Sequence, residues 1–325
     1  SQAPKQGQRQ SVEVNVKNLS PEIQKRFEEA DAKEWKAILE SGAVRVLSVK
    51  EASLVRRRYS DRIISSRMVR RLKPQEGLGT KPLPKSRWCV RGHQDADSED
   101  LHVYAPTPQS ESIMAVLQMI ASLKWDLEIA DAKNAFCRSD RLARPKGSIF
   151  VEPCEGLGLE SGSLIELVAP VYGLNDAPIL WHRTLTEWLV GQGYRKSLVE
   201  PCLYVKHESD SLVGLALVEV DDLILSFHPS ERDRFVSEAQ ERFKFGKWEI
   251  GETEFAGSRV RQVQDNRILV DQEKYILENI APMKLDSKNR SDKTRKLDKG
   301  EIHLYRSMCA QIQWVARESR QEVAG

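Results

Sequence analysis

The chain has 325 residues, of which 40% are hydrophobic and 30% are charged, and its formal net charge is +2. This length favours two or three subdomains over one compact unit. No apolar run approaches the roughly 18 residues that a membrane-spanning helix needs, and residues 1–17 lack the apolar block of a secretory signal. We therefore expect neither a membrane role nor secretion.

The five cysteines are odd in number, widely spaced and never arranged as a C-x-x-C pair. This pattern argues against a disulfide framework and against a zinc site, and it fits a reducing compartment. Basic residues crowd residues 56–73 and 284–299. Such runs are typical of polyanion binding or of solvated faces, and charge alone does not separate the two.

Hydrophobic periodicity predicts an alternation of helices and strands along the chain. Helical patterns cover residues 21–42, a segment from Ser110 to about 123, and residues 177–193, 231–243, 272–280 and 305–318. Asp176 is a candidate N-cap of the third of these and Ser110 of the second. Strand patterns cover residues 43–49, a basic hairpin at 63–90, and residues 125–131, 149–152, 163–168, 203–205, 212–227 and 255–270.

Two adjacent carboxylates, Asp221 and Asp222, interrupt the apolar run at residues 212–227, and Asp131 ends another short apolar strand. Asp221 and Asp222 could simply form an exposed hairpin turn. If the two strands are neighbours in one sheet, however, all three acids converge. Converging carboxylates raise one another's pKa and persist mainly where a divalent cation neutralises them.

A pair of Mg²⁺ ions, roughly 3.5 to 4 Å apart, clamps the attacking and leaving oxygens of an in-line phosphoryl displacement. The acids therefore indicate nucleotidyl transfer or phosphodiester cleavage. Nucleases and polymerases use the same metals, so the residues alone leave both open.

Several short blocks stand out in order along the chain: residues 85–92 (KSRWCVRG), 104–107 (YAPT), 131–136 (DAKNAF), 149–153 (IFVEP), 171–178 (VYGLNDAP) with Trp181, 219–222 (EVDD), 254–257 (EFAG) and 305–308 (YRSM). Together they resemble the motifs of copia-type (Pseudoviridae) LTR retrotransposon reverse transcriptases. The resemblance covers roughly residues 35–318. It implies an α+β right-hand polymerase with fingers, a ferredoxin-like palm and a partial thumb or connection.

The implied domains are a disordered tail at residues 1–20, N-terminal helices and fingers at 21–125, a palm at 126–250 and a truncated thumb or connection at 251–325. A fingers insertion is expected at about 140–170. The implied activity is RNA-directed DNA polymerisation by this segment of a Pol polyprotein. Its cofactor would be two Mg²⁺ ions, with Mn²⁺ as a substitute.

The resemblance also assigns site residues. Asp131, Asp221 and Asp222 would be catalytic and bind the metals. Phe136 stands where the family places an aromatic gate against the ribose 2′-OH, although ordinary core packing is an equal reading. The residues expected to bind the dNTP are Lys85, Arg87, Arg91, Phe136, Tyr172 and Gly173, while Trp181 is expected to be a helix-packing anchor.

The expected partners are an RNA and DNA template-primer, dNTPs, and the RNase H and integrase parts of a Pol polyprotein that lie outside this chain. The expected location is a cytoplasmic retrotransposon particle, the nucleus, or both.

Three positions depart from the family pattern. Glu219 replaces an aromatic residue or histidine, Asn175 and Asp176 replace a basic and amide pair, and residues 95–100 are acidic. Glu219 is therefore a possible variant site residue. These departures keep open a catalytically decayed relic or a domesticated nucleic-acid-binding protein, and a metal-dependent nuclease is a third reading.

Overall fold

The computed structural model describes residues 13–73, 82–280 and 294–318. Two compact units are formed from discontinuous segments, whereas the predicted domains are continuous: unit 1 joins residues 110–128 with 249–325, and unit 2 joins 11–109 with 129–248. Most of the predicted tail and of the second basic run lies outside the described residues. No described helix combines the length and the apolar character that a membrane crossing requires.

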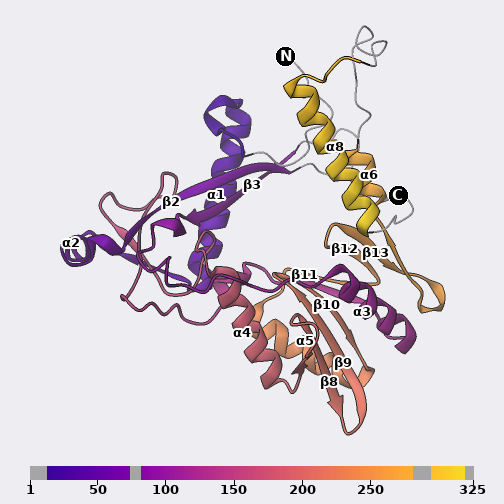
Figure 1. Ribbon diagram of the computed structural model, residues 1–325. Coiled ribbons are helices and arrows are strands. Elements are labelled where there is room, and N and C mark those ends of the chain that lie inside the picture. Colours follow the sequence, from indigo (N-terminus) through magenta and orange to yellow (C-terminus); the bar gives the residue numbers. More distant parts are fainter. Residues whose placement is uncertain (1–12, 74–81, 281–293, 319–325) are drawn as a thin grey trace. The chain divides into compact units, whose positions relative to one another are not determined.

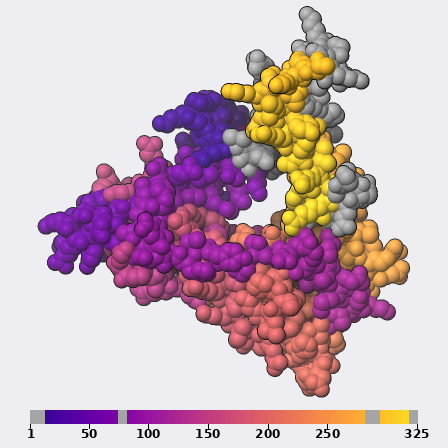
Figure 2. Space-filling view, in the orientation of Figure 1, coloured from indigo at the N-terminus to yellow at the C-terminus, as the bar shows by residue number. Residues whose placement is uncertain are grey.

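The first sheet of unit 2 has five strands in the order β1-β6-β5-β2-β3. Its strands are β1 (Val44–Leu47), β2 (Ile63–Lys73), β3 (Leu83–Val90), β5 (Phe150–Glu152) and β6 (Leu164–Leu167). The predicted basic hairpin is confirmed, because β2 and β3 pair antiparallel. Figure 2 shows pink surface from the middle of the sequence among the indigo surface of the N-terminal elements.

Helices α1 (Pro21–Ser41) and α2 (Val49–Arg58) accompany this sheet (Figure 1). The first helix begins with Pro21 after Ser20 and ends at Gly42, which adopts a left-handed conformation with φ 74°. Proline fits the first turn because its missing N–H needs no partner there, and glycine suits the left-handed end. One face of α1 is buried in the core through Phe27, Trp35 and Ile38.

The second sheet has six strands in the order β11-β4-β10-β9-β8-β7. Its strands are β4 (Glu128–Asp131), β7 (Arg195–Lys196), β8 (Leu203–Glu208), β9 (Ser211–Glu219), β10 (Asp222–Phe227) and β11 (Lys247–Ile250). Helices α4 (Ala177–Gly191) and α5 (Pro229–Phe243) pack on it through one hydrophobic cluster. The sequence β4-α4-β9-β10-α5-β11 with the spatial order β11-β4-β10-β9 is a ferredoxin-like βαββαβ arrangement, as the resemblance predicted.

Unit 1 contains the remaining regular elements. They are α3 (Ser110–Leu123), the three-stranded sheet of β12 (Glu252–Phe255), β13 (Ser258–Gln262) and β14 (Ile268–Asp271), and the helices α6 (Glu273–Asn279) and α8 (Lys299–Glu318). The rings of Tyr275 in α6 and Trp314 in α8 meet edge to face with centroids 4.3 Å apart. The α+β class is therefore confirmed. Short 3₁₀ turns occur at Val16–Asn18, Ser60–Arg62, Gly92–Gln94, Ala135–Arg138 and Gln264–Asn266.

Two local predictions were wrong. Ser110 is the first residue of α3 and not its cap. Asp176 precedes α4 but makes no capping hydrogen bond with its side chain. Its carboxylate binds the Arg144 guanidinium instead, with both oxygens at 2.7 Å from nitrogen, because a buried bidentate ion pair outcompetes a cap.

Backbone contacts join the end of β3 to the loop before α4. Val90 N–H donates to Tyr172 O at 2.9 Å, and Gly92 N–H donates to Gly173 O at 3.0 Å. Gly173 has φ +97°, and a Cβ at this position would lie 2.0 Å from Val90 O. Only glycine allows the two chains to approach so closely.

Replacing Gly173 with alanine should therefore lower the free energy of unfolding by roughly 3 kcal/mol, since backbone strain and overpacking add. The control is Gly191→Ala at the end of α4, where an added Cβ meets nothing within 4 Å and φ is not left-handed. Chemical denaturation measures both variants. Equal midpoints for the two would contradict this role of Gly173.

Candidate active site

The hairpin of β9 and β10 carries the adjacent acids. Glu219 lies directly opposite Asp222 in the antiparallel register, and Val220 and Asp221 form the turn between them. Val220 has φ 52°, which is a strained conformation for a β-branched residue. Strain of this kind persists only where surrounding contacts hold the backbone in place.

Two hydrogen bonds hold this turn. The indole Nε1–H of Trp181 donates to Val220 O at 2.5 Å, and Ala132 N–H donates to Asp221 O at 2.8 Å. Trp181 is fully buried and packs edge to face on Phe243, with centroids 5.2 Å apart. It is thus the helix-packing anchor that the sequence predicted, and it also fixes the acidic turn.

The same contacts bring the third acid to the turn. Asp131 ends β4 and immediately precedes Ala132, which binds the Asp221 carbonyl. The Asp131 carbonyl accepts the N–H of Gly246 at 2.9 Å. The backbone around Asp131 is therefore held on two sides, and β4 lies beside β10 in the second sheet, which is the neighbourhood that convergence of the acids requires.

The pKa values of two of these acids are raised, partly by the neighbouring carboxylates. Burial is the largest cause that raises the pKa of Asp222 to about 6, and Asp221, Asp131 and Glu219 raise it further. Burial also raises the pKa of Asp131, with Asp221 acting in the same direction. Each acid lies in the field of the others, as expected for carboxylates gathered for a function and not for stability.

Cations oppose this repulsion. Lys85, Lys247 and Arg87 each act to lower the pKa of Asp131, although burial and Asp221 outweigh them. The Lys85 side chain is exposed overall, yet partial desolvation lowers its pKa, followed by repulsion from Lys73 and Arg87. Positive and negative groups therefore face one another across this part of unit 2.

Five of the six residues predicted to bind a dNTP lie on neighbouring segments. The Arg87 guanidinium stacks over the Tyr172 ring at 4.0 Å, and the Phe136 ring meets that of Tyr172 edge to face at 5.0 Å. Lys85 lies two residues before Arg87 on β3, so both side chains point to the same face. Gly173 follows Tyr172 and permits the backbone approach described above.

The structure does not assign a role to two of the predicted residues, Arg91 and Phe136. The Arg91 side chain is exposed, and no hydrogen bond or ion pair in the described part of the chain ties it to this cluster. Phe136 is half-buried and packs against both core clusters of unit 2. Core packing and a gating role both remain compatible with its position.

The acids fit a divalent cation in chemistry, because hard cations take carboxylate oxygens. Asp221 acts to raise the pKa of Asp131, and Asp221 and Asp131 both act to raise the pKa of Asp222, so negative charge is gathered at these acids. Within the described ranges, however, no three His, Cys, Asp or Glu side chains are already grouped around one metal position. Binding would require rotation of the carboxylates about a backbone that is already fixed.

A buried charge network explains two of the departures from the family pattern. Arg62 pairs with Asp95 at 3.4 Å and with Asp97 at 2.8 Å, and Arg144 pairs with Asp95 at 3.0 Å and with Asp176 at 2.7 Å. All five side chains are at most 4% exposed. The acids at 95, 97 and 176 are therefore internal partners of arginines, a role that sequence reasoning missed.

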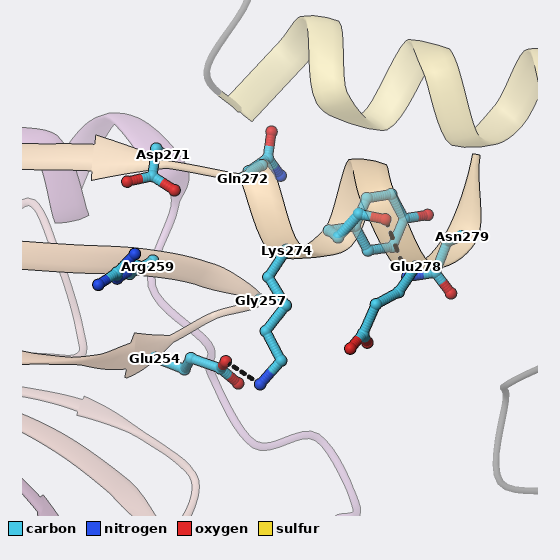
Figure 3. A pocket seen from close by; sticks show the side chains of 9 residues that line it. Glu254, Gly257, Arg259, Asp271, Gln272, Lys274, Glu278 and Asn279 are labelled. Atoms are coloured by element: carbon cyan, nitrogen blue, oxygen red, sulfur yellow. Dashed lines mark hydrogen bonds and ion pairs between the residues drawn. The ribbon is translucent and has the colours of Figure 1, made fainter. Parts of the chain in front are cut away.

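A separate pocket of about 170 Å³ lies in unit 1 between the β12 to β14 sheet and α6 (Figure 3). Two of its charged side chains are paired, Lys274 with Glu254 and Arg259 with Glu252. None of the residues predicted for catalysis or nucleotide binding lines it.

Comparison with known proteins identifies the class that this fold and these acids define. Residues 50–299 match the family described as "Reverse transcriptase (RNA-dependent DNA polymerase)". This match covers more than half of the chain, so the chain belongs to the reverse transcriptase family. The predicted resemblance to copia-type retrotransposon reverse transcriptases is confirmed.

The proteins similar to this chain include two curated relatives and one solved structure. The chain is 28% identical over 144 residues to the "Retrovirus-related Pol polyprotein from transposon TNT 1-94" of Nicotiana tabacum, covering 43% of this chain and 10% of that protein. It is 24% identical over 204 residues to that of transposon RE1 of Arabidopsis thaliana, covering 61% and 13%. The chain thus spans a small part of these curated relatives.

The third is a solved foamy viral protease-reverse transcriptase in complex with double-stranded DNA. It aligns with 98% of this chain and 43% of its own length, at 14% identity and a TM-score of 0.42. This likeness is weak.

Replacing Trp181 with phenylalanine should keep most of the packing but leave the buried Val220 carbonyl without its donor. An unsatisfied buried acceptor costs about 1–3 kcal/mol, so the free energy of unfolding should fall by about this amount. Chemical denaturation measures this effect.

The control is Trp188→Phe on the same helix, because Trp188 packs on Phe235 and Phe243 and not on the turn. Equal losses in both variants would mean that Trp181 acts only through general packing.

Proposed function

We propose that this chain is the polymerase segment of a retrotransposon Pol polyprotein and that it extends a primer with dNTPs by two-metal nucleotidyl transfer. The observation that carries the proposal is the backbone hydrogen bond from Ala132 to Asp221, which holds Asp131 next to the hairpin turn of Asp221 and Asp222, with Lys85 and Arg87 acting to lower the pKa of Asp131. Acids alone would also suit a nuclease. The two cations, of which Arg87 stacks on the Tyr172 ring, suit a triphosphate that must be held while it reacts.

Asp131 and Asp221 would hold both Mg²⁺ ions, and Asp222 would complete the acidic group beside the primer end. When bound, the metals would activate the 3′ hydroxyl and neutralise charge on the phosphates. Lys85 and Arg87 would bind the triphosphate, with Arg87 oriented by its contact with Tyr172. Phe136 would stand against the ribose and disfavour a 2′-OH.

The proposed partners are an RNA or DNA template with its primer, and the RNase H and integrase parts of the same polyprotein. The proposed location is a cytoplasmic particle, the nucleus, or both. A second candidate function is a decayed relic that binds nucleic acid without polymerising. Glu219 favours it, because this extra carboxylate lies opposite Asp222 and raises the pKa of that acid.

Replacing Asp221 with asparagine should leave the fold intact but lower Mg²⁺-dependent primer extension on an RNA template by about 1,000-fold or more, because metal stabilisation of the transition state is worth several kcal/mol. Asp131→Asn should behave in the same way. The control is Asp210→Asn, which changes an exposed acid in the turn before β9.

Unchanged extension rates in both Asp221→Asn and Asp131→Asn would show that the metal assignment is wrong. Glu219→Tyr separates the two candidate functions: it should maintain or raise extension if the glutamate is a defect. Loss of extension in Glu219→Tyr would instead make this glutamate a working ligand. A parent chain that binds primer-template but never extends it would establish the relic.

A further inference from the structure

Helix α1 lies entirely before the part of the chain that matches the family, which begins at residue 50. It is nevertheless built into unit 2 beside β2 and β3 (Figure 1). Trp35 meets Trp88 of β3 edge to face, with centroids 5.4 Å apart. Asp31, only 5% exposed in its side chain, binds Arg70 of β2 at 2.5 Å. This helix is therefore part of the same core as the nucleotide-binding strand.

Glu34 lies between these two anchors on α1. Its Oε1 accepts the backbone N–H of Trp88 at 3.3 Å. Trp88 directly follows Arg87, so this contact holds a carboxylate at the point of β3 from which the Arg87 side chain departs. Glu34 is itself half-buried, so water screens its charge only in part.

The charges around Glu34 are those of the candidate triphosphate site. Burial raises the pKa of Glu34, while Arg87 and Lys85 act to lower it. In turn, Glu34 acts to raise the pKa of Lys85 against the lowering effects of burial, Lys73 and Arg87. The carboxylate and the two cations therefore lie in one another's field.

The Glu34 carboxylate also reduces the repulsion between basic side chains of the β2 and β3 hairpin. Lys73 of β2 and Arg87 of β3 both act to lower the pKa of Lys85, because like charges close together repel. The anion on α1 offsets this repulsion before a nucleotide binds. When a triphosphate binds, Lys85 and Arg87 therefore attract it less strongly than they would without Glu34.

We propose that Glu34 is a positioning residue that acts as the resident counter-anion of Lys85 and Arg87 and sets the affinity of the polymerase site for the triphosphate. The inference rests on the proposed function of those two cations. It also makes α1 a part of the nucleotide site, although α1 precedes the residues that match the family.

The test is the Glu34→Gln variant, which keeps an oxygen acceptor for Trp88 N–H but removes the charge. Equilibrium binding of dTTP is measured by calorimetry at pH 8 with Mg²⁺, on an RNA template whose DNA primer ends in a dideoxynucleotide. Such a primer has no 3′ hydroxyl, so the measurement does not depend on whether the chain polymerises. The control is Glu29→Gln, an exposed acid on the same helix.

Glu34→Gln should bind dTTP about threefold or more tightly than the parent, because a competing anion has been removed, and the gain should shrink as salt screens the charges. Glu29→Gln should match the parent. A purely structural role of Glu34 would weaken binding or leave it unchanged.

Equal or weaker dTTP binding by a Glu34→Gln variant with the parent's melting temperature would overturn the proposal. Failure of the proposed polymerase function gives a different result. In that case the parent does not extend a primer that carries a 3′ hydroxyl, whereas the Glu34→Gln variant still binds dTTP more tightly than the parent.

Discussion

The structure depends on holding mutually repelling carboxylates at one hairpin turn. Charge cannot do this, since Asp131, Asp221 and Glu219 all raise the pKa of Asp222. Neutral contacts do it instead: the Trp181 indole fixes the Val220 carbonyl and Ala132 fixes that of Asp221. The stability of the ferredoxin-like core thus offsets the strain of the turn. Packing in the core thus stabilises a turn that would be unfavourable by itself.

The second constraint is the balance of charge around these acids. Lys85, Arg87 and Lys247 oppose their field, and Glu34 in turn opposes two of those cations. A buried network of Arg62 and Arg144 with three aspartates ties the loops of the same unit together. Buried pairs of this kind are weak evidence of net stability, but removing one partner leaves an uncompensated charge. The buried network therefore tolerates few single changes of charge.

Most elements and the three acids could be predicted from the sequence, because acids inside apolar strands and ordered motifs are strong local signals. The Trp181 bond, the Glu34 contact and the buried network could not. Their partners are distant in the chain: Arg62 and Asp95 are 33 residues apart, and Arg144 and Asp176 are 32 apart. Periodicity shows which face a residue lies on but not what it meets. For that reason the sequence predicts a helix cap at Asp176, whereas in the structure this carboxylate pairs with Arg144.

The most direct measurement of the central claim is thermal unfolding as a function of pH, with and without Mg²⁺. The pKa of Asp222 is raised from 3.8 to about 6, so without metal its ionisation should destabilise the fold as pH rises through this window, and the loss should be complete above it. Mg²⁺ should restore stability above that window in the parent chain but not in a double Asp131→Asn, Asp221→Asn variant. An equal Mg²⁺ effect in both proteins would contradict a metal site at these acids.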